Sequence, residues 1–174
     1  MELFEIMKNR RSIRNYTGEK LSDKQINEIL GAGLLGPSSM NKRPIEYIVV
    51  SDEKSLKTLS ESKAHGSAML EGASHAIVVI GDASRADAWI EDGSIAMAYM
   101  MLKAEEMGIA SCWVQIRLRK TAEDGPSGDY VKEALGIPEN FEVEAILSLG
   151  IPAEKEEPRD WNSKSSRRSI NFSG

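Results

Sequence analysis

The sequence predicts one domain of the α+β class, in which helices and strands alternate along the chain. Its 174 residues are enough to bury a hydrophobic core without disulfides or a structural metal. Hydrophobic residues make up 41% of the chain and charged residues 28%, a balance typical of folded globular proteins. Apolar residues recur at helical spacing in some segments and form short continuous runs in others. Because no repeat or linker divides the chain, we expect a single domain over residues 1–174.

The N-terminal segment is expected to be a short helix followed by an extended stretch. Apolar residues at helical spacing over residues 3–7 predict the helix, which ends at a cluster of charged residues. Residues 10–16 show the spacing of an extended chain. In that conformation alternate side chains share a face, which places Arg10, Ser12 and Arg14 on the same side.

The rest of the chain is expected to supply four strands and further helices. The nearly all-apolar run at residues 76–80 is typical of a central strand buried on both faces. The long helix at residues 88–107 is apolar on almost every side, so a second subunit could cover part of it. Polar residues after position 152 predict a C-terminal arm over residues 153–174. The other expected elements are strands at 45–51, 109–116 and 142–149 and helices at 22–35, 52–62, 67–73 and within 121–136.

A glycine motif at the end of the second helix imitates a dinucleotide-binding fingerprint. Residues 31–36 spell GxGxxG, and an acidic residue follows at a suitable distance. In a dinucleotide-binding fold, however, the glycines follow a strand and open a helix. Here they close a helix that begins with a capping box at Ser22. We therefore interpret Gly31 and Gly33 as sites of close helix packing and Gly36 as the helix C-cap.

Charge and cysteine content exclude several classes of partner and cofactor. A net charge of -5 argues against broad nucleic-acid binding, which requires a concentrated surplus of Lys and Arg. The single cysteine, Cys112, and two scattered histidines make no metal-ligand spacing. No signal peptide is evident, and the longest run of low charge, residues 94–102, is too short to span a bilayer. We expect a cytoplasmic protein with no metal and no membrane partner.

Two polar segments carry the candidate chemistry. Three arginines and a serine lie within residues 10–14, and arginine binds phosphate in bidentate fashion. A solvated basic patch is the alternative interpretation of such a cluster taken alone. The loop at residues 37–44 favours a binding site, because its short polar side chains and turn residues suit a ring edge or a ribityl chain.

These two segments together resemble the signature of the nitroreductase family, RRSxRxY followed by GPSSxNxxP. The strand at residues 76–80, the start of the apolar helix at 89–92 and the segment 107–114 also match, so the resemblance covers nearly the whole chain. It implies a three-layer α/β/α sandwich whose central mixed sheet is extended by the partner's C-terminal arm. It also implies a homodimer with FMN at the interface, which passes hydride from NAD(P)H to a small electron-poor acceptor, such as a nitroaromatic or a quinone, by ping-pong kinetics.

The resemblance gives the N-terminal arginines separate roles. Arg10 and Ser12 would hold the FMN phosphate, and Arg11 would join that cluster. Arg14 would face the pyrimidine side of the ring, where reduction places negative charge that a fixed guanidinium stabilises. No side chain needs to act as a nucleophile, because the cofactor carries the reaction.

The remaining expected cofactor contacts come from three other segments. One segment would belong to the opposite subunit, one would pass along the edge of the ring near flavin N5, and one would close on the phosphate. These residues are Pro37, Ser38, Ser39 and Asn41 from the opposite subunit, Val114, Gln115 and Ile116 along the ring, and Arg167 or Arg168 at the phosphate.

Other polar residues have simpler interpretations. Cys112 is expected to be a small buried hydrophobe, and His65 and His75 lack a partner that would make either a base or a ligand. Glu91 and Asp92 are expected to cap the helix or form salt bridges. Residues 64–69 differ from the Asn and Lys that some larger family members have near the flavin.

Two alternatives to nicotinamide-dependent reduction remain open. The same fold with FMN also hosts dehalogenation, enone reduction and flavin-consuming chemistry. The chain could also be a flavin-binding protein without turnover.

Overall fold

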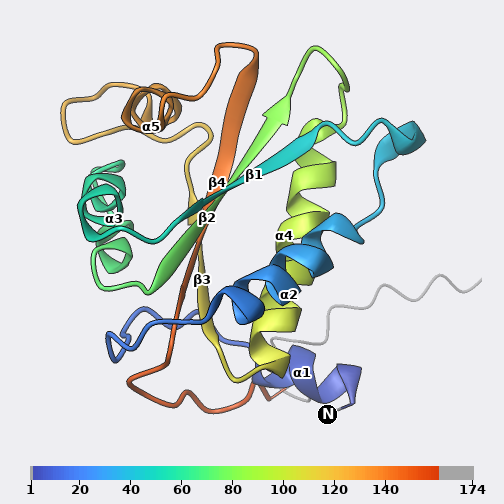
Figure 1. Cartoon of the computed structure of the whole chain (residues 1–174), viewed down its shortest axis with the longest axis vertical. Helices are drawn as coiled ribbons and strands as arrows, with labels where there is room; N and C mark the ends of the chain where they lie inside the picture. The colour runs from blue at the N-terminus through green and yellow to red at the C-terminus, as the bar shows by residue number, and fades with distance from the viewer. Residues whose placement is uncertain (1, 161–174) are drawn as a thin grey trace, which may run out of the picture.

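The computed structural model describes residues 2–160, which form a four-stranded sheet between two helical layers (Figure 1). The strand order is β1-β2-β4-β3, and each of the three pairings is antiparallel. The expectation of a mixed sheet is therefore wrong for these strands, because β4 runs against both of its neighbours. Within residues 2–160, parallel pairing is confined to an isolated bridge between Ser12 and Ser111. The strands are β1 (Ile45–Val50), β2 (His75–Asp82), β3 (Ala110–Gln115) and β4 (Phe141–Gly150).

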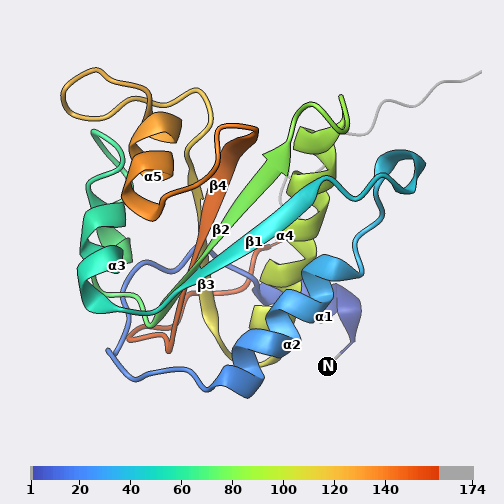
Figure 2. The ribbon, with the colours of Figure 1, turned by 45° about the horizontal axis from the view of Figure 1, so that its top comes forward.

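Helices cover both faces of the sheet, as the three-layer sandwich requires (Figures 1 and 2). One layer holds α3 (Glu53–Ser60) and α5 (Ser127–Leu135), and the other holds α1 (Leu3–Asn9), α2 (Asp23–Leu34) and α4 (Trp89–Glu106). Short 3-10 turns at Ser39–Asn41 and Ala68–Leu70 replace the loop and the short helix expected there.

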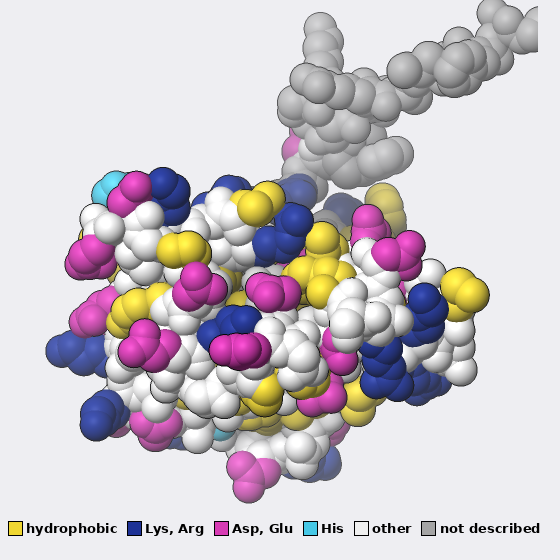
Figure 3. Space-filling view, turned by 90° about the horizontal axis from the view of Figure 1, so that it is seen from above, with side chains coloured by type: hydrophobic (Ala, Val, Ile, Leu, Met, Phe, Trp, Pro, Cys, Tyr) yellow, Lys and Arg dark blue, Asp and Glu magenta, His cyan; other side chains and the backbone are white. Residues whose placement is uncertain are grey.

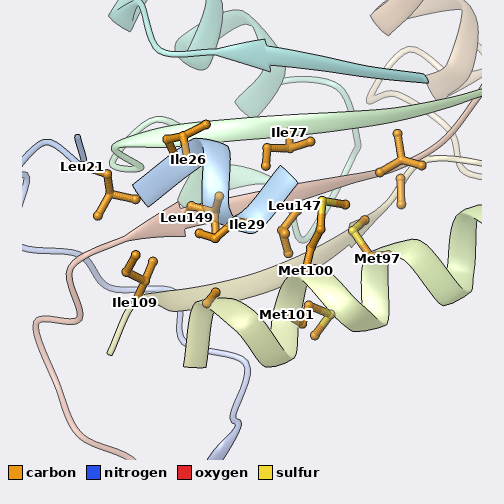
Figure 4. Packing of buried hydrophobic residues seen from close by; sticks show 13 residues of the cluster. Leu21, Ile26, Ile29, Ile77, Met97, Met100, Met101, Ile109, Leu147 and Leu149 are labelled. Carbon is orange, nitrogen blue, oxygen red and sulfur yellow. The ribbon is translucent and has the colours of Figure 1, made fainter. Parts of the chain in front are cut away.

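The core is divided between the two faces of the sheet. Figure 4 shows the cluster on the face covered by α2 and α4, where Ile29, Met97 and Met100 pack against Ile77 and Leu147. All five of these residues are fully buried. Because β2 lies between two paired strands and two helical layers, its side chains are apolar on both faces, as the continuous apolar run predicts.

The structure bears on the predictions made for the start of α2 and for its glycines. The capping box is present, since the Ser22 side chain and the Gln25 side chain each bond the other's backbone N–H. A Cβ at Gly33 would lie 3.0 Å from Met100 Cγ, so the close packing expected there is confirmed. At Gly31 a Cβ would meet nothing within 4 Å, and the interpretation of that glycine is wrong. The cap residue is Leu35, and Gly36 instead allows a close approach to Ala96.

Helix α4 packs one side against the sheet and exposes large apolar side chains on another side. Ile95 and Tyr99 are 36% and 43% exposed, although both are large and apolar. Their face continues onto neighbouring helices, where a mostly apolar cleft of about 460 Å³ opens. Its apolar lining consists of Leu3, Ile6, Met7, Ala32, Leu35, Tyr99 and Leu102.

Candidate functional site

The extended segment after α1 lies along the open edge of the sheet. Strand β3 is an edge strand, and its Ser111 carbonyl accepts a hydrogen bond of 3.2 Å from the backbone N–H of Ile13. Farther along, the Tyr16 hydroxyl donates to the Ile13 carbonyl and shares a 2.7 Å hydrogen bond with Ser148 on β4. These bonds fix residues 12–16 against β3, although the segment is not a regular strand.

Arg10 has the most unusual environment of the three N-terminal arginines. Its side chain is half-buried, and Nη1 has no hydrogen-bond partner within residues 2–160. Burial and then the nearby charge of Arg159 lower the pKa of Arg10, while Glu105 acts in the opposite direction. A buried guanidinium nitrogen without an acceptor is costly. The arrangement therefore suits a bound anion.

Arg11 is occupied by the C-terminal segment of its own chain. Its Nη1 donates to the Glu157 carbonyl, and its Nη2 lies 3.5 Å from a carboxylate oxygen of Glu156. The same segment is tied to α1, because the backbone N–H of Arg159 donates to the Lys8 carbonyl at 2.9 Å.

Arg159 was missed by the sequence analysis, which looked for a basic residue only at Arg167 and Arg168. The structure places Arg159 close enough to Arg10 to affect its pKa. Arg167 and Arg168, like most of the expected arm, lie outside the described residues. The available signal was the single arginine among acidic residues in the stretch 154–160.

Arg14 projects to a second part of the same edge. It is exposed, donates to the Ser12 carbonyl at 3.1 Å, and lines an open cleft of about 710 Å³. Gly66, Ala68 and Met69 line the same cleft. The segment at residues 64–69 thus contributes to the cleft with Arg14, even though its side chains differ from those of larger family members.

Alternate residues of β3 turn their backbone N–H groups toward the open edge of the sheet. Ile116 is not one of these, because its N–H bonds to the Glu144 carbonyl at 3.2 Å. The Ser111 carbonyl faces the open edge, and alternate residues of a strand face the same way. The N–H of Gln115 therefore points toward the open edge, while Val114 is fully buried.

The loop that contains Pro37, Ser38, Ser39 and Asn41 lies far from the arginines in the same chain. The Ser38 hydroxyl and the Ser39 N–H both bond Asp92, at the start of α4 (Figure 1). Arg10 interacts instead with Glu105, near the other end of α4. The axial rise between the two ends is roughly 20 Å. One chain alone does not bring the two motifs together.

Glu144 is a buried acid that the sequence analysis did not single out. It is 2% exposed, and its Oε1 accepts a hydrogen bond of 2.6 Å from Ser94, whereas Oε2 has no partner within residues 2–160. Burial raises the pKa of Glu144 to about 7, against the Ser94 hydrogen bond and the charge of Arg117. An acidic residue between Val143 and Ala145 was the only signal in the sequence.

Cys112 has the environment of a structural residue. Cys112 is buried, and burial raises the pKa of its thiol, which fits the expected small hydrophobe.

Across residues 2–160, no group of three or more His, Cys, Asp and Glu side chains is placed to hold a metal ion. The helices described here are all too short or too polar to cross a membrane. On the face in Figure 3, Lys and Arg are interspersed with Asp and Glu.

Comparisons with known proteins agree with this arrangement. The model of the Nitroreductase family matches residues 7–66 and 53–151. A protein of Archaeoglobus fulgidus, provisionally named as an NADH dehydrogenase/NAD(P)H nitroreductase, is 38% identical over 160 residues, which are 90% of this chain and 88% of the relative. An FMN-dependent nitroreductase of Clostridium difficile R20291 superposes with a TM-score of 0.91 at 37% identity, over 97% of this chain and 99% of the other. The chain therefore belongs to the nitroreductase family.

Proposed function

We propose that this chain is an FMN-dependent oxidoreductase that uses NAD(P)H to reduce a small electron-poor acceptor. The observation that carries the proposal is the buried Nη1 of Arg10, which lacks an acceptor within residues 2–160 and lies close to Arg159. A phosphate would satisfy that nitrogen and relieve the repulsion between the two guanidinium groups. The similar protein of Clostridium difficile, whose description names FMN, supports this choice of anion.

The residues along the sheet edge suit the other parts of such a cofactor. Arg10 and Ser12 would hold the phosphate, and Arg159, Arg167 or Arg168 would close over it. Arg14 would lie beside the ring, and the outward N–H of Gln115 would face its edge. When bound, FMN would accept hydride from NAD(P)H and pass it to the acceptor. Arg14 would stabilise the negative charge of the reduced ring.

The site would be completed by a second copy of the chain. The loop at Ser38 and Ser39 lies roughly 20 Å along α4 from the arginines, and an apolar face that includes Tyr99 and Leu102 lies between them. Burying that face in a two-fold dimer would carry one chain's loop toward the other chain's arginines. The family match and this exposed apolar face support a homodimer, as does the expected C-terminal arm.

The visible spectrum of the purified protein tests the proposal. We expect a yellow protein that releases FMN on denaturation and is bleached by NADH or NADPH without oxygen. A colourless protein that does not bind added FMN would refute the proposal, and a yellow protein that neither nucleotide bleaches would be a flavin binder without this turnover. A panel of nitroaromatic, quinone, enone and halogenated acceptors then separates plain reduction from the other chemistry that this fold hosts, and double-reciprocal plots test for ping-pong kinetics.

A further inference from the structure

Asp92 is a buried carboxylate that bonds only to the loop before β1 in the part of the chain described here. It is 5% exposed and lies in the first turn of α4. Its Oδ2 accepts a hydrogen bond of 3.0 Å from the Ser38 hydroxyl, and its Oδ1 accepts one of 2.9 Å from the Ser39 N–H. No Lys or Arg pairs with it within residues 2–160. Two donors from the loop, together with the helix N-terminus, therefore offset the cost of burying this charge.

The Ser38 hydroxyl also holds the far side of the loop by a second hydrogen bond. A hydroxyl group can donate one hydrogen bond and accept others. The Ser38 hydroxyl donates to Asp92 and accepts a hydrogen bond of 2.8 Å from the Arg43 N–H. One oxygen atom thus connects α4 to both ends of the turn.

The turn held in this way has an uncommon backbone conformation. Met40, Asn41 and Arg43 have φ angles of 51°, 55° and 47°, in the left-handed region that non-glycine residues seldom adopt. Such a conformation persists only where the surrounding contacts impose it. Met40, at the tip, is 84% exposed, so the loop is not held by burial of its own side chains.

We propose that Asp92 is a positioning residue that fixes the loop at residues 38–43 in the shape required to contact the FMN of the second subunit. This inference rests on the proposed function for its second half. The anchoring of the loop by Asp92 stands on the geometry of a single chain. In D92N one of the two carboxylate oxygens becomes an amide NH2, so Ser38 and Ser39 lose one of their two acceptors and the charge of the other, and the strained turn then relaxes.

Trypsin provides a test of the loop that does not depend on FMN. The loop contains a cleavable bond after Lys42, whereas the bond after Arg43 precedes Pro44 and resists the enzyme. We expect D92N to speed cleavage after Lys42 at least fivefold, with other sites unchanged as an internal reference. E91Q is the matched control, because it removes one negative charge from an exposed position on the same turn of α4. Its cleavage rate should equal that of the wild type.

FMN affinity, measured by quenching of flavin fluorescence, tests the second half. D92N should weaken binding about tenfold, as expected for the loss of one hydrogen bond to a charged group. S38A should act in the same direction, and S38T, which keeps the hydroxyl, should restore both the affinity and the resistance to trypsin. E91Q should match the wild type in both assays.

Each outcome bears on a separate part of the inference. If D92N and S38A leave cleavage after Lys42 unchanged, Asp92 does not anchor the loop and the inference is overturned. If both variants loosen the loop but bind FMN as the wild type does, the role toward the cofactor is overturned and the anchoring is supported. If the wild type itself binds no FMN, the proposed function fails, whereas faster cleavage in D92N still supports the anchoring.

Discussion

The carboxyl group of Glu144 lies against the Cα atom of Gly93, in the space that a side chain at position 93 would occupy. A Cβ built on Gly93 would overlap Glu144 Oε2 and approach Ile45 Cδ1 at 3.4 Å. Because the Ser94 hydroxyl bonds the other carboxylate oxygen, the acid cannot simply turn away. Strand β4 and helix α4 are thus fitted together at a position where only glycine leaves room.

G93A is expected to destabilise the fold by about 2–4 kcal/mol, since overpacking would also disturb a buried polar group. G31A is the matched control. Gly31 also lies inside a helix, but a Cβ there would meet no atom within 4 Å. That variant should be stabilised by about 0.5–1 kcal/mol, the usual preference for alanine over glycine in helices. Urea unfolding of both variants measures the difference, and equal stability would show that position 93 is not tightly packed.

The stability of the protein should decrease as the pH rises through the range in which Glu144 ionises. The folded-state pKa of Glu144 is about 7, above its usual value of 4.5, so the folded chain binds more protons in between. Stability is therefore greatest below pH 4.5 for this group and is lost by pH 7, by on the order of 3 kcal/mol. E144Q should remove this slope, and E46Q, at an exposed position on β1, should not. Urea midpoints between pH 5 and 8 measure both, and an unchanged slope in E144Q would contradict the prediction.

His75 should act in the opposite sense at lower pH. Burial, followed by the charge of Lys20, lowers the pKa of His75 below 6.5. The Ser74 hydroxyl accepts the Leu21 N–H at 2.7 Å and shares a hydrogen bond of 2.9 Å with His75 Nδ1. Stability is then lost as the pH falls below 6.5, because the unfolded chain takes up a proton more readily than the folded chain. H75N in an E144Q background should remove this loss, whereas H65N, at an exposed position, should leave it unchanged.

Arg10 and Arg14 are expected to affect different quantities. R10M should raise the Kd for FMN about 100-fold, as expected when a charge-assisted hydrogen bond to phosphate is lost. R14M should change the Kd little but lower kcat about tenfold, because Arg14 would stabilise the reduced ring rather than the phosphate. R85M removes an exposed arginine elsewhere and should change neither quantity. Fluorescence titration and steady-state rates separate the two effects. Equal losses of affinity in R10M and R14M would show that both arginines serve the phosphate.

Arg159 is expected to contribute to phosphate binding because it lies close to Arg10. R159M should raise the Kd for FMN about tenfold, and the effect should shrink at high salt because salt screens the attraction between Arg159 and the phosphate. The double variant R167M/R168M is the comparison, since the family resemblance assigns the phosphate contact to one of those residues. A larger effect in the double variant would return the role to them.

The sequence predicted those features that depend on neighbouring residues. The capping box at Ser22 placed the start of α2, and the apolar run before Gly81 placed β2. The direction of the strands depends on which strands become neighbours, and local patterns carry no information about that. The expectation of a mixed sheet came from the family resemblance, whereas β1 to β4 are antiparallel.

The candidate site was predictable as two motifs but not as a set of contacts. The cluster at Arg10 and the loop at Ser38 were identified from their composition, whereas the bond between Ser38 and Asp92 joins residues 54 positions apart. Asp92 was expected to cap its helix or form a salt bridge, and it instead accepts hydrogen bonds from a distant loop. Glu144 was overlooked because one acidic residue in a strand is ordinarily an exposed one.

The separation of the two motifs along α4 has a consequence for mixed dimers. If each flavin site takes arginines from one chain and a loop from the other, two differently damaged chains can compensate for each other. A chain carrying R10M and a chain carrying both D92N and S38A would, when co-assembled, produce one site with both defects and one site with neither. In such a mixed dimer one of the two sites would bind FMN with wild-type affinity, although both sites of each parent homodimer bind it more weakly.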